Sequence, residues 1–174
     1  MARMLADGKT TMLLLDEWPE NPRTATVADL ADAQDASCVV GKSGFGIGAG
    51  SPNTAEDTPL CTEGDTTIPV SKTYEATMNV YRYFNKDGQI DEEEDFFFQA
   101  LKEFGAEVPV AIREGGKTHE QPPEAGDEWS FYKLVSGGMG RATDGEGYTK
   151  RVAHVSVSDA AEDVVISGGD ESGE

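Results

Sequence analysis

Hydrophobic and polar side chains alternate most regularly along Thr73–Phe84. The apolar positions carry Tyr74, Ala76, Met78 and Val80, and the intervening positions carry Glu75, Thr77, Asn79 and Tyr81. Successive side chains of a strand point to opposite faces of a sheet. The alternation therefore predicts a β-strand with one apolar face and one largely polar face.

A second period, typical of a helix, follows this strand. Apolar residues recur at i, i+3, i+4 and i+7 at Phe97, Ala100, Leu101 and Phe104. This spacing predicts a short helix with a core-facing stripe. Asp91 and Glu94 fit a capping box at its start, and Gly105 fits a left-handed residue at its end. Asn85–Gly88 is the expected turn between the strand and the helix.

Shorter apolar runs predict the remaining strands. Val108–Arg113 is one of them, and we expect it near a sheet edge because Pro109 cannot donate a backbone hydrogen bond. The other predicted strands are Ser37–Val40, Glu128–Val135, Thr149–Val157 and Val164–Ile166. Thr10–Asp16 is predicted either as a short buried strand or as an arm that pairs elsewhere. Thr26–Ala33 is expected to form a turn or two of helix, with Val27 and Leu30 facing inward.

About seven or eight strands and one good helix predict a mostly β (α+β) fold. We expect a β-sandwich or partly closed barrel with one flanking α-helix. Residues 1–174 are assigned to a single domain. Within it we predict an N-terminal arm (residues 1–22), a long hairpin-like inter-subunit loop that becomes ordered against a neighbouring subunit (residues 41–65) and a flexible acidic tail (residues 168–174). Gly137–Gly147 is predicted as a second glycine-rich loop.

Composition excludes several classes of function. Lys and Arg number 14 against 33 Asp and Glu, which gives a formal net charge of −19. Proteins that grip nucleic-acid phosphates or anionic membranes need a cationic surface, so neither is expected as a binding partner. The longest apolar run near the start, Met12–Leu15, is too short for a signal peptide or a membrane span. We therefore expect a protein made in the cytoplasm.

Tyr83–Glu94 (YFNKDGQIDEEE) resembles a twelve-residue calcium loop. Asn85, Asp87, Gly88, Ile90, Asp91 and Glu94 fall on positions three, five, six, eight, nine and twelve of that loop. However, Tyr83 occupies the first ligand position, and a strand pattern precedes it where an EF-hand has a helix. We interpret the segment as a turn that leads into a capped helix, and we predict no metal site.

No catalytic or cofactor-binding residue is predicted elsewhere. Gly44–Gly50 (GFGIGAG) lacks the spacing of a nucleotide-binding loop and is interpreted as flexible. His119 and His154 have no histidine or cysteine partner at metal-ligand spacing, although a group assembled only in space is left open. Cys38 and Cys61 are too few for a disulfide framework; a single bridge between them is left open, and two buried or partly buried free thiols are the favoured interpretation.

The order of these segments resembles the major tail protein, or tail tube protein, of siphophages, notably those that infect actinobacteria. The similar segments are Asn21–Val40 (NPRTATVADLADAQDASCVV), Phe96–Gly116 (FFFQALKEFGAEVPVAIREGG), Ala125–Asp127 with the strand Glu128–Val135, and Tyr148–Val157 with the closing strand. The similarity spans most of residues 20–167.

This resemblance implies a structural virion protein without enzymatic activity. It implies hexameric rings that are assembled in the host cytoplasm and stack into a hollow tube for the passage of genomic DNA. The implied partners are further copies of the chain, the tape measure protein, the tail terminator, and distal tail or baseplate proteins. Two alternatives remain open: a head decoration or head–tail connector protein, and a small calcium-binding module.

Overall fold

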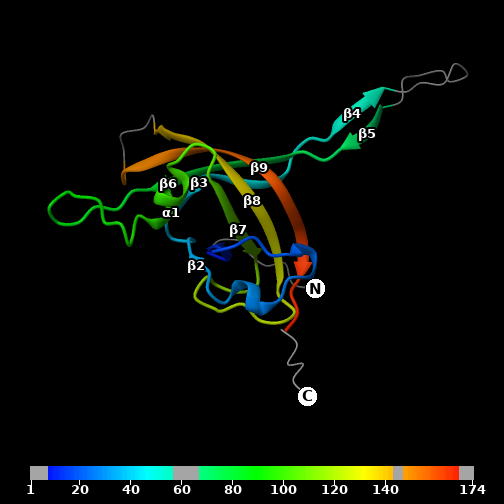
Figure 1. Cartoon of the computed structure of the whole chain (residues 1–174), viewed down its shortest axis with the longest axis horizontal. Helices are drawn as coiled ribbons and strands as arrows, with labels where there is room; N and C mark the ends of the chain where they lie inside the picture. The colour runs from blue at the N-terminus through cyan, green and yellow to red at the C-terminus, as the bar shows by residue number, and fades with distance from the viewer. Residues whose placement is uncertain (1–7, 57–66, 143–146, 169–174) are drawn as a thin grey trace, which may run out of the picture.

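The computed structural model describes residues 8–56, 67–142 and 147–168 (Figure 1). Its strands are β1 (Thr10–Leu14), β2 (Gln34–Asp35), β3 (Val40–Ala49), β4 (Asn53–Glu56), β5 (Thr67–Ser71), β6 (Tyr74–Tyr81), β7 (Glu107–Glu114), β8 (Glu128–Arg141) and β9 (Lys150–Val165). One α-helix, α1 (Phe96–Leu101), and two 3-10 helices, η1 (Pro22–Thr24) and η2 (Val27–Leu30), are also present. No helix in these ranges is long and apolar enough to cross a membrane.

Seven strands form one antiparallel sheet in the order β2-β1-β7-β8-β9-β6-β3. The sheet curls until its two ends approach each other. Ala36 N donates to Met12 O of β1 at 2.8 Å, and three residues later Val39 O accepts from Tyr81 N of β6 at 2.9 Å. The sheet remains open, so a single curved sheet with one short helix replaces the alternative of two stacked sheets. The predicted mostly β fold is confirmed.

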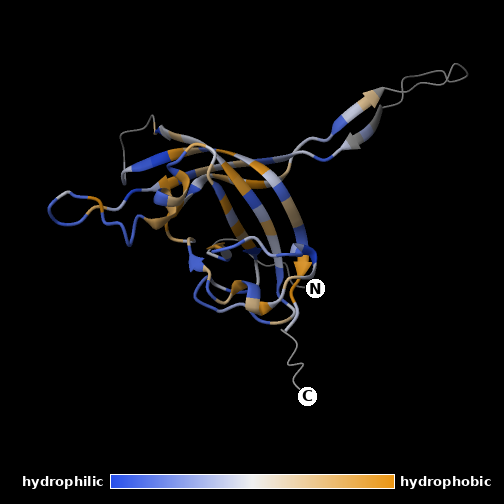
Figure 2. Cartoon of the chain, viewed as in Figure 1, coloured by the Kyte–Doolittle hydropathy of each residue, from blue (hydrophilic) through white to orange (hydrophobic). Residues whose placement is uncertain are grey.

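Both faces of the sheet carry buried apolar side chains, because neighbouring positions of several strands point into different clusters. The concave cluster contains Met12, Met78, Val80, Phe97, Leu101, Val108, Val110, Ile112, Tyr132 and Leu134. The other cluster contains Leu13, Leu15, Leu30, Ala111, Trp129, Phe131, Ala161, Val164 and Ile166. The segment with η1 and η2 covers this second face at one end of the sheet, and Figure 2 shows the apolar stretches of the strands.

Thr10–Leu14 lies in the main sheet between β2 and β7, so the buried strand is the correct one of its two interpretations. The prediction of an arm over residues 1–22 is therefore wrong for these residues. The predicted helical turn at Thr26–Ala33 is a 3-10 helix with Leu30 buried. Ser37–Val39 is a turn, and the strand predicted there begins only at Val40.

Helix α1 ends at Leu101, earlier than its apolar spacing predicts. Phe97 and Leu101 are buried, whereas Phe104 is 86% exposed, so the prediction that Phe104 faces the core is wrong. The predicted capping residue Asp91 accepts from Glu94 N, but the residue at the N-cap of α1 is Asp95. Gly105 does adopt a left-handed conformation (φ 83°) and donates to Ser136 O at 2.7 Å.

Strand β7 lies inside the sheet, which corrects the prediction of an edge strand. Pro109 lies opposite Leu15, just beyond the end of β1. Leu15 N donates to the Pro109 carbonyl, and because β1 has ended, no ladder hydrogen bond from the Pro109 nitrogen is needed. Strand β8 continues through Gly137, Gly138 and Gly140, which were predicted as loop. The two strands predicted at Thr149–Val157 and Val164–Ile166 are one strand, β9, with Asp163 in a left-handed conformation.

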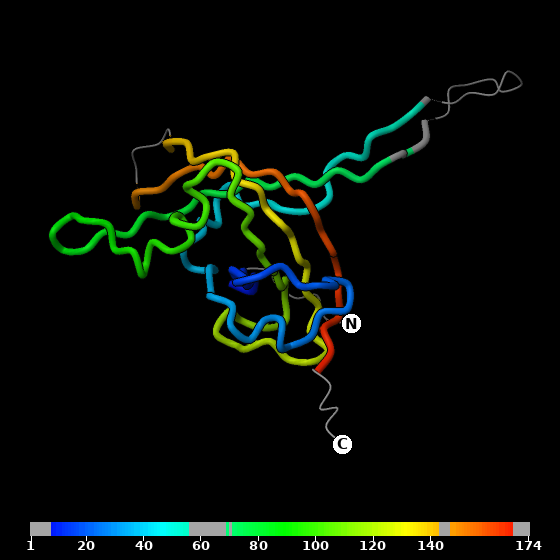
Figure 3. Tube along the Cα trace, in the orientation of Figure 1, coloured from blue at the N-terminus to red at the C-terminus, as the bar shows by residue number. Residues whose placement is uncertain are grey.

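Within the predicted loop of residues 41–65, the described part (residues 41–56) is largely strand. Gly41–Ala49 belongs to β3, which pairs with β6, and Asn53–Glu56 forms a separate two-stranded ribbon with β5. We call residues 53–56 and 67–71 the ribbon; Figure 3 shows it pointing away from the sheet. Residues 57–66, including Cys61, and residues 169–174 of the predicted tail lie outside the described residues.

Truncation of Phe97 tests the packing of α1 on the sheet. Phe97 is 1% exposed, so Phe97→Ala should lower the free energy of unfolding by about 3–5 kcal/mol through lost burial and a cavity. The matched control is Phe104→Ala, at 86% exposure, which should stay within about 0.5 kcal/mol of the unaltered chain. Urea unfolding followed by circular dichroism measures both; equal losses would contradict the position of α1.

Candidate functional site

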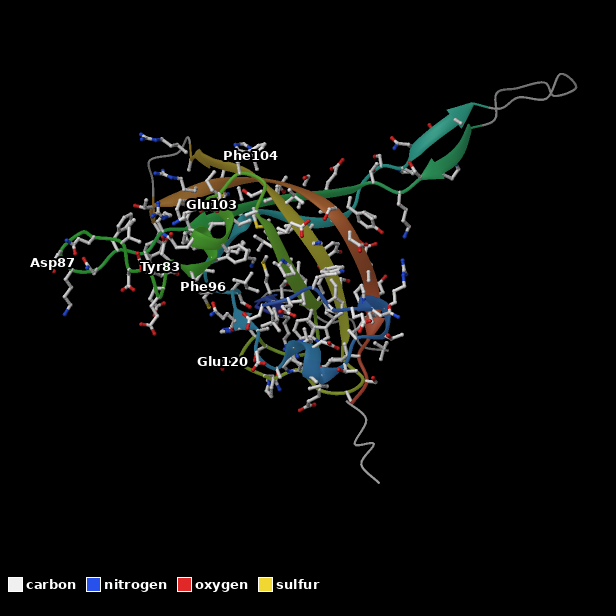
Figure 4. All side chains as sticks on the ribbon, viewed as in Figure 1. Tyr83, Asp87, Phe96, Glu103, Phe104 and Glu120 are labelled. Atoms are coloured by element: carbon white, nitrogen blue, oxygen red, sulfur yellow. The ribbon has the colours of Figure 1, made fainter. Side chains whose placement is uncertain are left out.

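A hairpin formed by residues 83–91 projects on the side opposite the ribbon, with Asp87 near its tip (Figure 4). Phe84 and Ile90 pair across it, and both are about half exposed. Asn85 holds the turn, since its side-chain Oδ1 accepts from Asp87 N at 3.0 Å and from Gln89 N at 2.9 Å. Gly88 has the positive φ (75°) that a tight turn requires.

The residues that resemble a calcium loop therefore belong to this hairpin. Strand β6 precedes it, and the side-chain oxygen of Asn85 is already committed to backbone amides. Among the described residues, no group of three or more His, Cys, Asp or Glu side chains is placed to hold a metal ion. The predicted turn at Asp87 and Gly88 is confirmed.

A buried ion pair anchors the base of the hairpin to α1. Arg82 Nε lies 3.0 Å from Asp95 Oδ1, and the exposed fractions of the two side chains are 8% and 0%. Asp95 also accepts from Tyr83 N at 3.1 Å and from Gln99 Nε2 at 2.9 Å. The Arg82 guanidinium stacks on the Phe98 ring at 3.6 Å. A buried charge with this many partners fixes the direction in which the hairpin leaves the sheet.

Strand β3 presents glycines on one face and apolar residues on the other. Gly46 and Gly48 pair with Thr77 and Glu75 of β6, so they share the polar face of that strand. Phe45 and Ile47 pack instead against the concave cluster. The open polar face, defined by Glu75, Thr77, Asn79 and His154, is continuous from β6 to β9 through the pair Thr77–His154.

Glu162 attaches the far end of β3 to the part of β9 that extends beyond its pairing with β6. Its Oε1 accepts from Ala49 N at 3.1 Å and from the Tyr132 hydroxyl at 2.9 Å. Burial and the bond to Glu162 raise the pKa of Tyr132 well above its usual range, because both favour the protonated hydroxyl that donates this bond. Ala49 N is thereby satisfied although it does not bond to β6.

The ribbon is joined to the sheet through a narrow neck. Gly50 N donates to Thr73 O at 2.8 Å, and the Thr73 hydroxyl donates to Ser51 O. Asn53 Nδ2 then donates to Ser71 Oγ at 2.9 Å, where the ribbon begins. Its described side chains at Asn53, Thr54, Ala55, Pro69 and Ser71 are exposed.

The two histidines lie in different surroundings. His154 is exposed on the open polar face, beside Gly140, where a Cβ atom would lie 2.7 Å from its Nε2. His119 contacts Asp35 and Cys38, residues more than 80 positions away in the chain. No local spacing could have revealed this group, because β2 and the loop before β8 meet only after β1 and β7 have paired.

An open sheet with a long edge strand, a projecting ribbon and an anchored hairpin defines the class of a structural protein built for association. Residues 1–169 match the family model described as "Phage tail tube protein". The chain therefore belongs to the phage tail tube protein family, whose members self-assemble into the tail of the virion and are not enzymes. A search of curated proteins found no match.

Family membership decides between the functions that the sequence left open. The chain is a structural component of the tail tube, and the alternatives of a head decoration protein, a head–tail connector and a calcium-binding module are set aside. The resemblance inferred from the order of the segments is confirmed at the level of the phage tail tube protein family.

Removal of the Asp95 charge tests the hairpin anchor. Asp95→Asn keeps the size of the side chain but leaves Arg82 buried without its counter-charge, which should cost about 3–5 kcal/mol of stability. Asp87→Asn, at the exposed tip of the same hairpin, is the control and should change stability by less than about 0.5 kcal/mol. Denaturant unfolding of both variants gives the comparison; an unchanged Asp95→Asn variant would show that the pair contributes nothing.

Calcium should leave the stability of the protein unchanged, because the hairpin lacks an acidic first ligand and uses Asn85 internally. Thermal unfolding with millimolar calcium and with a chelator should give the same midpoint, for the unaltered chain and for Asp87→Ala. A midpoint that rises with calcium and no longer does so in Asp87→Ala would demonstrate a site.

Proposed function

We propose that this subunit forms hexameric rings that stack into the tail tube of a siphophage, and that genomic DNA passes through the lumen. Membership of the tail tube family supports the tube, and the resemblance of segments such as Phe96–Gly116 supports the siphophage type. In the proposed tube, the edge of β3 and the ribbon join one copy to the next, and the open polar face meets the DNA.

The long edge of β3 is the observation that carries the proposal. Six of its ten residues pair with β6, with a register shift between Gly41 and Gly46, and β3 is the last strand in the order of the sheet. Apart from Lys42, the strand includes no charged residue and no proline. Soluble proteins usually protect such an edge with charge, proline or a covering segment. Pairing with a strand of the neighbouring subunit would satisfy the free backbone groups and continue the sheet around the ring.

The open polar face is the proposed lumen surface. Glu75 and Thr77 are exposed there, and the glycines of β3 beside them keep the surface flat. Across the whole chain the formal charge is −19, so DNA phosphates meet a net repulsive field. Repulsion favours passage without adhesion, in agreement with the expectation of no specific DNA binding.

The ribbon and the N-terminal residues are proposed to contact neighbouring subunits or rings. An exposed two-stranded ribbon is marginally stable alone, and packing on another chain would stabilise it. At the ends of the tube, the same surfaces would meet the tail terminator and the distal tail or baseplate proteins, while the tape measure protein would occupy the lumen during assembly.

Removal of the ribbon tests its role in assembly. Replacing residues 53–71 with an Asn-Gly turn cuts the chain beyond the bond between Gly50 and Thr73, so the sheet should keep its stability. We expect the variant to remain monomeric by size-exclusion chromatography and to form no tubes in negative-stain images. Tubes of normal appearance would contradict a role of the ribbon in joining subunits.

The hexameric ring has an independent test in electron cryo-microscopy of tubes or tails that contain the unaltered chain. Six copies around the axis, with β3 beside a strand of the next copy, are the expected result. Another rotational symmetry, or a β3 edge facing solvent in the tube, would overturn the proposed ring.

A further inference from the structure

Three side chains from separate segments form a group that the tube function does not use. Asp35 lies in β2, Cys38 in the turn after it, and His119 in the loop between β7 and β8. Asp35 Oδ2 lies 2.8 Å from His119 Nδ1, and His119 Nε2 lies 3.9 Å from Cys38 Sγ. This is the order of acid, histidine and thiol that activates a nucleophilic cysteine in other proteins.

Hydrogen bonds to Ser37 fix Asp35 and the turn that carries Cys38. Asp35 Oδ1 accepts from Ser37 N at 2.8 Å, and Ser37 Oγ accepts from Met12 N of β1 at 2.9 Å. These bonds fix the turn that carries Cys38 to the main sheet.

The loop that carries His119 is fixed by a buried arginine. Arg113 Nη2 donates to Thr118 O and to Gln121 O, each at 2.9 Å, on either side of the histidine. Arg113 Nη1 lies 3.0 Å from Asp127 Oδ2, and its side chain is 3% exposed. The imidazole is therefore presented by a rigid segment.

The charge of Asp35 sets the roles of the two imidazole nitrogens. Burial raises the pKa of Asp35, but hydrogen bonds from Ser37 and His119 outweigh it and hold the pKa below its usual value. An ionised carboxylate keeps a proton on Nδ1, so that the lone pair of Nε2 is directed at the thiol. Cys38 is exposed, so a small reagent can reach its sulfur.

We propose that Cys38 is a reactive thiol and the modification site of this chain for exchange with small disulfides. His119 accepts the thiol proton, and the thiolate attacks one sulfur of the disulfide. A new S–S bond to Cys38 forms as the old one breaks; Cys38 is oxidised, and the departing thiolate is reduced and takes up the proton from His119. Asp35 acts as a positioning residue for His119.

The reaction is tested with a neutral aromatic disulfide, dithiodipyridine, which reports exchange by the absorbance of the released thiopyridone. A Cys61→Ser background leaves Cys38 as the sole thiol of the chain. Adding His119→Gln should slow the exchange at neutral pH by at least about threefold, since the proton acceptor is lost. His154→Gln in the same background is the matched control and should leave the rate unchanged.

Two further measurements separate activation from a structural effect. In concentrated guanidinium chloride the rates of all variants should become equal, because the group exists only in the folded chain. The titratable groups facing the site are Asp35, His119 and Tyr83, whose hydroxyl donates to Cys38 O at 3.4 Å. When the exchange rate is measured as a function of pH, the rate of the Cys61→Ser chain should fall less steeply toward acid than the rate of His119→Gln. Asp35→Asn should shift this pH profile toward that of His119→Gln.

Equal rates with and without His119, or a difference that persists after unfolding, would overturn the proposal. A slower His119→Gln variant with an unchanged Asp35→Asn profile would assign activation to the histidine and overturn the positioning role of Asp35. None of these outcomes depends on tube formation, because every measurement uses the single chain, either folded or unfolded in guanidinium chloride.

Discussion

The open sheet creates the constraint on which the rest of this structure depends: each of its two edges leaves backbone donors and acceptors to be satisfied. The two edges of the sheet satisfy this constraint differently. On one side the last strand, β2, has only two residues, and the following turn returns to β1 through Ala36. On the other side β3 runs for ten residues as an edge and then extends into the ribbon. One end is closed within the chain, and the other is the edge that we propose to pair with a neighbouring copy.

The sheet is packed on both faces at one end only. There, Trp129 and Phe131 lie on one face and Tyr132 and Leu134 on the other. Toward β6 and β3, one face keeps its apolar contacts while the other carries Glu75 and Thr77 in solvent. The anchored hairpin leaves the sheet from this second region. The subunit thus combines one end that is packed on both faces with another end that has an exposed polar face and a projecting hairpin.

The sequence was sufficient where the side chains themselves carry the period. Tyr74–Tyr81 alternates as predicted, with Met78 and Val80 buried. It misled at β3, because glycines were counted as loop residues although apolar Phe45 and Ile47 occupy every second position between them. It also misled at Phe104, where the helical period continues beyond a helix that ends at Leu101. The contact of Cys38 with His119 depends on the order of β2, β1 and β7, which no local pattern contains.

Charge limits how such subunits can associate. Each copy carries a formal −19, so copies brought together in a ring repel one another at long range. Of the described acids, Asp95, Asp127 and Glu162 are engaged by internal donors, whereas others, such as Glu92 and Glu93, lie exposed beside the hairpin. Attraction must therefore come from contacts of short range, such as the backbone pairing at β3 and the packing of the ribbon that we propose. Because salt screens repulsion between exposed charges but hardly affects backbone pairing, association of this chain should strengthen as ionic strength rises.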